Sequence, residues 1–210
     1  FTGPNTFIPL LEDSALIIPL GRWIINTAAK ACNRWITSIP DFVMHINLSF
    51  VQIVKSNIVK DVLENIERYS AANNHYVFEI TETIEMDQIP AVQNVFKEFV
   101  KNEFRFAIDD FGTGYSNYGY MRDRTFDIVK VDRSCVTDID KLKDNYLMVS
   151  FIIKIAHEMG LHVCIEGVET KEELSCVKKL GADYIQGYYY GKPVCLQDFE
   201  EQHLKRFVLG

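Results

Sequence analysis

A repeated alternation of strand-like and helix-like segments is the feature that most constrains the fold of this chain. Six short apolar runs, typical of buried strands, alternate with segments of helical periodicity, of which the one after Ser116 is short. The predicted strands cover residues 42–49, 77–82, 104–108, 126–132, 162–167 and 184–188, and the main predicted helices cover 21–35, 51–69, 89–100, 145–159, 171–180 and 196–207. Such alternation requires a parallel sheet with helices packed outside it. We therefore expect an α/β fold.

Two architectures satisfy this alternation: an open doubly wound sheet and a (β/α)8 barrel. No Gly-x-Gly-x-x-Gly follows the first strand, which disfavours a dinucleotide-binding sheet. Each predicted strand instead carries a polar residue near its carboxyl end, where (β/α)8 barrels assemble their active sites. These residues are Asn47, Glu79, Asp109, Lys130, Glu166 and Gln186. Singly, each could be a helix cap, a surface lysine or the end of an edge strand. Their common position favours the barrel.

The adjacent carboxylates Asp109 and Asp110 directly follow the predicted strand 104–108. Because unpaired buried charges are costly, two like charges at this place indicate a cationic partner, and a divalent metal is the simplest candidate. The alternative is a solvated loop in which aspartates cap turns.

The polar residues at the strand ends, together with Asp110, have side chains suited to phosphodiester hydrolysis. Oxygen ligands such as Asn47, Glu79 and the two aspartates suit Mg²⁺ or Mn²⁺ rather than zinc. Paired aspartates can hold two ions about 4 Å apart, and such a site activates water and clamps a phosphodiester. Glu166 could orient or deprotonate that water, and Lys130 could offset negative charge. We expect Glu82 to brace the Gly112-Thr113-Gly114 loop.

The composition of the chain limits the kinds of ligand that the protein can bind and the compartment in which it can reside. A net charge of −7 and a pI of about 5.3 argue against a duplex nucleic-acid binder, although metal ions would still allow an anionic ligand. The five scattered cysteines include no Cys-x-x-Cys pair, which favours reduced thiols in a cytoplasmic protein. No apolar run approaches the ~20 residues of a membrane span. The chain begins with Phe1 rather than Met, so we expect a piece of a longer protein, which an absent segment could tether to a membrane.

Seven motifs together resemble the EAL family of bacterial cyclic-di-GMP phosphodiesterases. The most specific is Asp-Asp-Phe-Gly-Thr-Gly-Tyr-Ser, and the motifs run in family order over nearly the whole chain. They are Phe7-Ile8-Pro9-Leu10, Asn47-Leu48-Ser49, Glu79-Ile80-Thr81-Glu82, Asp109-Asp110-Phe111-Gly112-Thr113-Gly114-Tyr115-Ser116, Lys130-Val131-Asp132-Arg133-Ser134, Glu166-Gly167-Val168-Glu169-Thr170 and Gln186-Gly187-Tyr188.

The resemblance implies a modified (β/α)8, TIM-like barrel that hydrolyses cyclic di-GMP to linear pGpG with two Mg²⁺ or Mn²⁺ ions. It implies metal ligation by Asn47, Glu79, Asp109, Asp110 and Glu166, with Glu166 also a candidate general base. Lys130 and Gln186 match residues near the attacking water. It further implies loop-stabilising roles for Glu82 and Glu169, and a substrate loop made by Phe111, Gly112, Thr113 and Gly114.

The departure from the family lies at the amino-terminal end. The Glu-Ala-Leu strand, whose glutamate also binds metal, is not in this chain. We therefore expect residues 1–210 to form a single EAL domain that is N-terminally truncated and lacks the first two strands. This leaves an alternative open, namely a catalytically inactive cyclic-di-GMP receptor or dimerisation scaffold. The family also implies a homodimer and an upstream sensor or GGDEF domain in the parent protein.

Overall fold

The computed structural model describes residues 3–69, 72–81, 89–113, 121 and 125–204. The chain forms two compact units. Unit 1 comprises residues 1–80, 84–105 and 195–210, and unit 2 comprises residues 81–83 and 106–194. Within the described ranges, no helix is long and apolar enough to cross a membrane.

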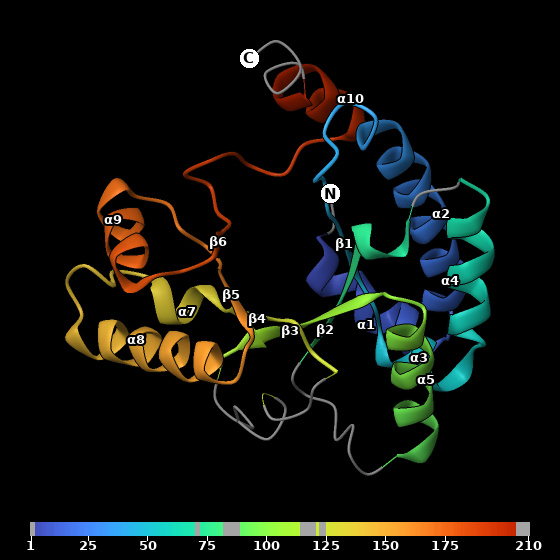
Figure 1. Ribbon diagram of the computed structural model, residues 1–210, viewed down its shortest axis with the longest axis horizontal. Coiled ribbons are helices and arrows are strands. Elements are labelled where there is room, and N and C mark those ends of the chain that lie inside the picture. The colour runs from blue at the N-terminus through green and yellow to red at the C-terminus, as the bar shows by residue number, and fades with distance from the viewer. Residues whose placement is uncertain (1–2, 70–71, 82–88, 114–120, 122–124, 205–210) are drawn as a thin grey trace. The chain divides into compact units, whose positions relative to one another are not determined.

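Unit 1 combines two parallel strands with a layer of helices. Strand β1 (Met44–Asn47) pairs with strand β2 (Tyr76–Thr81), and Asn47 lies opposite Glu79 in the register. The helices are α1 (Pro4–Asp13), α2 (Ile17–Trp35), α3 (Phe50–Lys55), α4 (Ile58–Glu67), the short 3₁₀ helix η1 (Asn73–His75) and α5 (Pro90–Lys101). Helices α2 and α4 lie side by side (Figure 1).

The carboxyl-terminal segment of the chain also belongs to unit 1. It comprises α10 (Leu196–Phe199) and the π-helical turn η3 (Glu200–Leu204). Glu200 accepts hydrogen bonds from Arg34 at 2.6 Å and from the Trp35 indole at 3.0 Å, and the ring of Phe199 packs on Trp35. These contacts tie the end of the chain to the end of helix α2.

Unit 2 holds four parallel strands that pair in chain order. They are β3 (Arg105–Phe111, of which residues 106–111 belong to this unit), β4 (Ile128–Val131), β5 (His162–Ile165) and β6 (Tyr184–Ile185). Its helices are α7 (Arg133–Val136), α8 (Lys143–Glu158) and α9 (Lys171–Leu180). Helix α8 packs against α7, α9 and strand β5 (Figure 1). The parallel strands confirm the predicted α/β alternation.

Each unit has its own apolar core between strands and helices. In unit 1 the fully buried Phe78 of β2 meets the rings of Phe99 and Phe104 edge-on, at centroid distances of 5.0 and 5.6 Å. In unit 2, strand residues Val129 and Val163 are fully buried, as is Val177 of helix α9. Strands buried on both faces are the expected consequence of helices covering a parallel sheet.

Several predicted boundaries were wrong, including the end of the last predicted strand, which stops at Ile185 and not at residue 188. The predicted helix 51–69 is two helices, because Ser56 is extended and its hydroxyl donates to the carbonyl of Gln52 instead of continuing the helix. Strand β3 does not end at Ile108 but runs through both aspartates to Phe111. The last predicted helix changes to a π-helical turn after Phe199, and residues 205–207 lie outside the described part of the chain.

Candidate active site

A buried lysine lies at the centre of the polar residues of unit 2. Lys130 is in strand β4, and its side chain is 4% exposed. Its ammonium nitrogen lies 2.8 Å from Oδ1 of Asp109 on β3 and 2.7 Å from Oε1 of Glu166, which directly follows β5. Three neighbouring parallel strands therefore bring one cation between two carboxylates. Because an isolated buried ammonium is costly to desolvate, these two ion pairs are what allow a lysine at this place.

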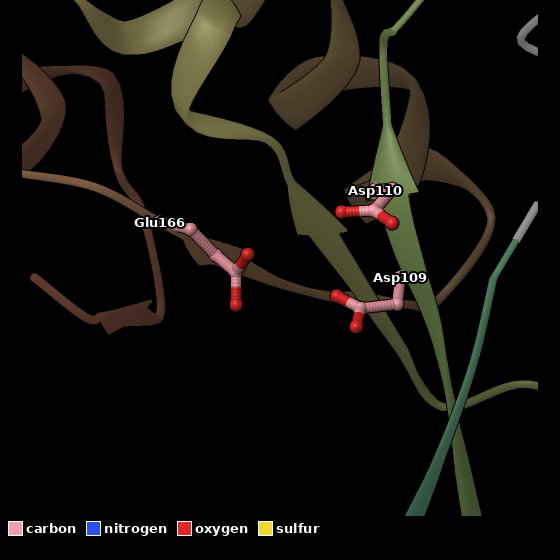
Figure 2. Close-up of side chains that lie close together, drawn as sticks. All are labelled: Asp109, Asp110 and Glu166. Carbon is pink, nitrogen blue, oxygen red and sulfur yellow. The ribbon is translucent and has the colours of Figure 1, made fainter. Parts of the chain in front are cut away.

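Asp110 adds a third carboxylate through a local distortion of the strand. Successive residues of a regular strand point to opposite faces. Here Asp110 has a left-handed backbone with a φ of 56°, and the pairing of β3 with β4 shifts register between Ile108 and Phe111. Figure 2 shows the result: the carboxylates of Asp109, Asp110 and Glu166 lie together, with one oxygen of each within 4.8 Å of the others. A left-handed aspartate costs roughly 1–2 kcal/mol, which is typical of strain held at functional sites.

The donor set of this cluster suits a hard divalent cation. All three candidate ligands are carboxylates, which favour Mg²⁺, Mn²⁺ or Ca²⁺ over zinc or copper. Three ionised carboxylates and one ammonium, −3 and +1, leave a formal charge of −2 at the cluster. Asp110 is exposed and Glu166 is half-buried, so an ion would have access to them. These residues therefore fit the predicted metal chemistry.

The loop after β5 positions Glu166 through its backbone. The amide of Glu166 donates to the carbonyl of Val131 at 3.0 Å, which continues the strand pairing by one residue. Gly167 has a φ of 71°, and a Cβ there would lie 2.4 Å from Cγ of Arg133, so a larger residue would displace the arginine. Arg133 in turn pairs with Glu169 at 2.9 Å. This contact agrees with the predicted loop-stabilising role of Glu169, which stays a prediction.

Glu173, which the sequence analysis did not identify, anchors the same loop. Its side chain accepts hydrogen bonds from the backbone amides of Glu169 at 2.9 Å, Thr170 at 3.0 Å and Asp138 at 3.2 Å. Burial alone would raise the pKa of this carboxyl, but the backbone hydrogen bonds outweigh burial and hold its pKa below the usual 4.5. The signal in the sequence was the Thr170-x-x-Glu173 capping box at the start of α9.

The loop after β3 is held by a close contact at Gly112. This residue has a φ of 104°, and a Cβ would lie 2.6 Å from Sγ of the buried Cys135. The Thr113 hydroxyl donates to the carbonyl of Asp110 at 3.1 Å. Gly114 and Glu82 lie outside the described residues, so the predicted bracing of this loop by Glu82 stays a prediction.

Gln186 directly follows strand β6, and its side chain is exposed. The backbone N–H of Gln186 donates to the carbonyl of Ile165 at 2.8 Å, and its backbone carbonyl accepts from the N–H of Val168 at 3.2 Å. The backbone of Gln186 therefore fixes the end of the loop that carries Glu166. A Cβ at the next residue, Gly187, would lie 2.1 Å from the carbonyl oxygen of Val168, which explains the Gln-Gly pair. The role of the Gln186 side chain beside an attacking water stays a prediction.

Unit 1 carries the other two predicted ligands as a neighbouring pair. Asn47 ends β1 opposite Glu79 of β2, and the amide of Leu48 donates to the Glu79 carbonyl at 2.9 Å. The buried carboxylate of Glu79 also lies 2.7 Å from Nδ1 of His45, which the sequence analysis missed. The loop after β1 is fixed by Ser49, which caps α3 and donates to the Glu12 carboxylate at 2.6 Å.

The EAL domain profile matches residues 1–193 of the chain. The chain belongs to the EAL domain family. The resemblance given by the sequence motifs is therefore confirmed, and with it the α/β barrel class to which this family belongs.

The relatives of this EAL chain carry names from cyclic-di-GMP metabolism. It is 31% identical over 194 residues to the cyclic di-GMP phosphodiesterase PdeL of Escherichia coli, covering 91% of this chain and 53% of PdeL. It is 29% identical over 192 residues to the bifunctional diguanylate cyclase/cyclic di-GMP phosphodiesterase MucR of Pseudomonas aeruginosa, covering 91% of this chain and 28% of MucR. The chain thus spans about half the length of one relative and less than a third of the other.

Two solved structures show the same EAL fold with ligands. The PaMucR phosphodiesterase, in a complex with cyclic di-GMP, has a TM-score of 0.87 and 28% identity, covering 93% of this chain and 80% of that one. BlrP1 of Klebsiella pneumoniae, in a manganese and cyclic-di-GMP complex, has a TM-score of 0.71 and 25% identity, covering 82% of this chain and 45% of that one.

Replacing Glu173 tests how firmly the Glu166 loop is anchored. In Glu173→Gln the new amide group faces a backbone N–H where a carboxylate oxygen accepted, so we expect a loss of about 1–3 kcal/mol in the free energy of unfolding at pH 7. Because the folded pKa is lowered, the carboxylate stabilises the fold above about pH 4.5 and this contribution is lost as the pH falls through the folded pKa. The difference in the free energy of unfolding between Glu173→Gln and the unmodified protein should therefore shrink in acid.

Urea denaturation at pH 7 and below pH 4 measures this difference. Glu172→Gln is the matched control, because Glu172 is the exposed neighbour on the same helix and should change stability little. An equal loss in both variants, or a Glu173→Gln loss that is independent of pH, would contradict the anchoring role.

Proposed function

We propose that this chain is a metal-dependent phosphodiesterase that hydrolyses cyclic di-GMP to linear pGpG in bacterial second-messenger signalling. The observation that carries the proposal is the carboxylate cluster of Asp109, Asp110 and Glu166 around the buried Lys130. Family membership supports it, since relatives and structural neighbours are named for this substrate.

We assign metal ligation to five residues. Asp109, Asp110 and Glu166 would hold an ion through the carboxylates that lie together in unit 2, and the family motifs imply the same role for Asn47 and Glu79. Either Mg²⁺ or Mn²⁺ suits these oxygen ligands, and the manganese complex of BlrP1 supports Mn²⁺. When bound, such a pair of ions lowers the pKa of a water and neutralises phosphate oxygens.

The residues around the metal positions have separate roles in the proposed reaction. Glu166 accepts a proton from the attacking water, whose oxygen bonds to phosphorus while the bond from phosphorus to the ribose 3′ oxygen breaks. The 3′ oxygen takes up a proton from solvent and leaves as a hydroxyl, the proton on Glu166 returns to solvent, and the new 5′ phosphate stays on the linear product. Lys130 holds Asp109 and Glu166 in place and offsets negative charge near the phosphate. Gln186 lies by the water.

The loops flanking the cluster complete the assignment. Phe111, Gly112, Thr113 and Gly114 are assigned to the substrate loop, and the close contact between Gly112 and Cys135 supports a fixed position for Gly112. Glu82 and Glu169 stabilise loops, and the pair between Glu169 and Arg133 supports the second role. We infer that residues 1–210 act as one EAL domain.

We further infer a cytoplasmic location and a longer parent protein. An odd number of scattered cysteines suits a reducing compartment. An upstream sensor or GGDEF domain is supported by MucR, whose name joins a cyclase to the phosphodiesterase.

We also propose that the protein is a homodimer, because helix α8 exposes an apolar face. Val149, Ile152, Ile153 and Ala156 pack inward from this helix. Large apolar side chains cover other positions of the helix, with Leu147 53% exposed and Met148 46% exposed. Large apolar side chains exposed at neighbouring positions of one helix favour an interface there. A second copy of the same helix would match its chemistry.

Hydrolysis of cyclic di-GMP with Mn²⁺, followed by chromatography of the linear product, tests the proposed reaction. We expect chelation by EDTA to abolish product and Mn²⁺ to restore it. Glu166→Gln removes the proton acceptor and should lower kcat by about 10²- to 10⁴-fold. Glu172→Gln, an exposed glutamate on α9, should leave kcat unchanged. Binding of cyclic di-GMP without hydrolysis by the unmodified protein would instead establish the receptor or scaffold function.

Analytical ultracentrifugation tests the dimer. Leu147→Glu places two charges in a symmetric interface and should raise the dimer dissociation constant at least about tenfold. Leu16→Glu is the matched control, because Leu16 is 55% exposed at the start of α2 and should not change dimerisation. A monomeric unmodified protein, or equal dissociation constants for the two variants, would contradict the α8 interface.

A further inference from the structure

His45 lies beside the proposed metal ligands of unit 1 but is absent from the motif that identified them. It is the second residue of strand β1, two positions before Asn47. Because side chains alternate along a strand, His45 and Asn47 share one face, while Ile46 between them points to the other and is buried. The imidazole therefore belongs to the polar face of β1.

The imidazole contacts the proposed ligand Glu79 directly. Nδ1 of His45 lies 2.7 Å from Oε1 of Glu79, whose side chain is 6% exposed. An ionised carboxylate can only accept hydrogen bonds, so Nδ1 is the donor. The His45 side chain is 37% exposed, and strand pairing places His45 opposite Val77 and Asn47 opposite Glu79. The hydrogen bond thus runs diagonally between two neighbouring strands.

We propose that His45 is a positioning residue that fixes the carboxylate of Glu79 for metal binding. This inference rests on the proposed function. A carboxylate can turn about its last side-chain bond and present either one or two oxygens to an ion. The Nδ1–H donor holds Oε1 at a set position and so restricts that rotation. Hydrogen bonds of this kind to metal ligands commonly change metal affinity by 10- to 100-fold.

Two substitutions of His45 separate the effect of its hydrogen-bond donor from the effect of its ring on packing. An asparagine side chain carries its amide nitrogen at about the place of imidazole Nδ1, whereas phenylalanine keeps the ring and has no donor. We therefore expect His45→Phe to weaken Mn²⁺ binding by about 10- to 100-fold and His45→Asn to retain most of the affinity. A purely structural role for the ring would give the reverse order.

The matched control is His157→Phe. His157 also contacts a carboxylate, Asp183, at 2.8 Å, and its side chain is 40% exposed, close to the values for His45. It lies on α8, outside the polar faces assigned to metal binding. We expect no change in Mn²⁺ affinity for this variant. The control therefore shows whether the loss of any histidine–carboxylate pair is by itself sufficient to weaken Mn²⁺ binding.

Isothermal titration with Mn²⁺ measures these affinities, and cyclic-di-GMP hydrolysis is recorded separately. Equal affinity of His45→Phe and the unmodified protein would overturn the inference while leaving the phosphodiesterase proposal intact. If the unmodified protein binds Mn²⁺ but cleaves nothing, the proposed reaction fails and the order of the His45 variants still decides the inference. Absence of Mn²⁺ binding to the unmodified protein would overturn both.

A second readout is independent of metal and of any effect of the variants on folding. In the metal-free protein with neutral histidines, ¹H–¹⁵N spectra should show His45 with its proton on Nδ1, assigned by the loss of its signals in His45→Asn. A His45 ring protonated on Nε2 alone would show that it does not donate to Glu79 and would overturn the inference.

Discussion

The buried ammonium of Lys130 is the constraint on which the rest of the site depends. A lysine side chain that is 4% exposed near the carboxyl end of a strand would be strongly unfavourable unless opposite charges surround it. Asp109 and Glu166 provide those charges from the two flanking strands. The three residues hold one another, because removal of Lys130 would leave two like charges close together. This mutual dependence explains why these three residues occur together at the ends of neighbouring strands.

The excess of negative charge turns a structural ion pair into a candidate metal centre. Lys130 neutralises only part of the cluster, and the left-handed backbone at Asp110 adds a carboxylate that a regular strand would direct to the opposite face. The strained backbone at Asp110 therefore adds a negative charge beyond what is required to neutralise the buried lysine. Helix α9 completes the arrangement, because Glu173 holds the backbone of the loop that carries Glu166. Charge and backbone geometry together favour a divalent ion.

The sequence predicted what depends on periodicity and on the positions of strand ends. Alternating apolar runs gave the parallel strands, and the carboxyl ends of those strands supplied Asp109, Lys130 and Glu166, which the structure brings together. The register shift at Asp110 could not be predicted, because it depends on how β3 pairs with β4. The same limit hid His45, whose importance comes from a neighbouring strand and not from its own surroundings in the sequence.

The break in the predicted helix 51–69 has a different origin. Ser56 and Asn57 have polar side chains that compete with helical hydrogen bonding, but both also occur inside helices, so periodicity outweighed them in the prediction. Glu173 was detectable, since its capping box is a local pattern. Its contact with Asp138, by contrast, joins helix α9 to the loop between α7 and α8 and required the structure.

Crystals of the protein grown with Mn²⁺ and measured at the manganese absorption edge would test directly whether the carboxylate cluster binds metal. We expect anomalous density bound to the carboxylates of Asp109, Asp110 and Glu166, and its weakening in Asp110→Asn. Anomalous density only at surface sites distant from Lys130, or none in a protein that remains folded, would contradict the assignment of this cluster as a metal centre.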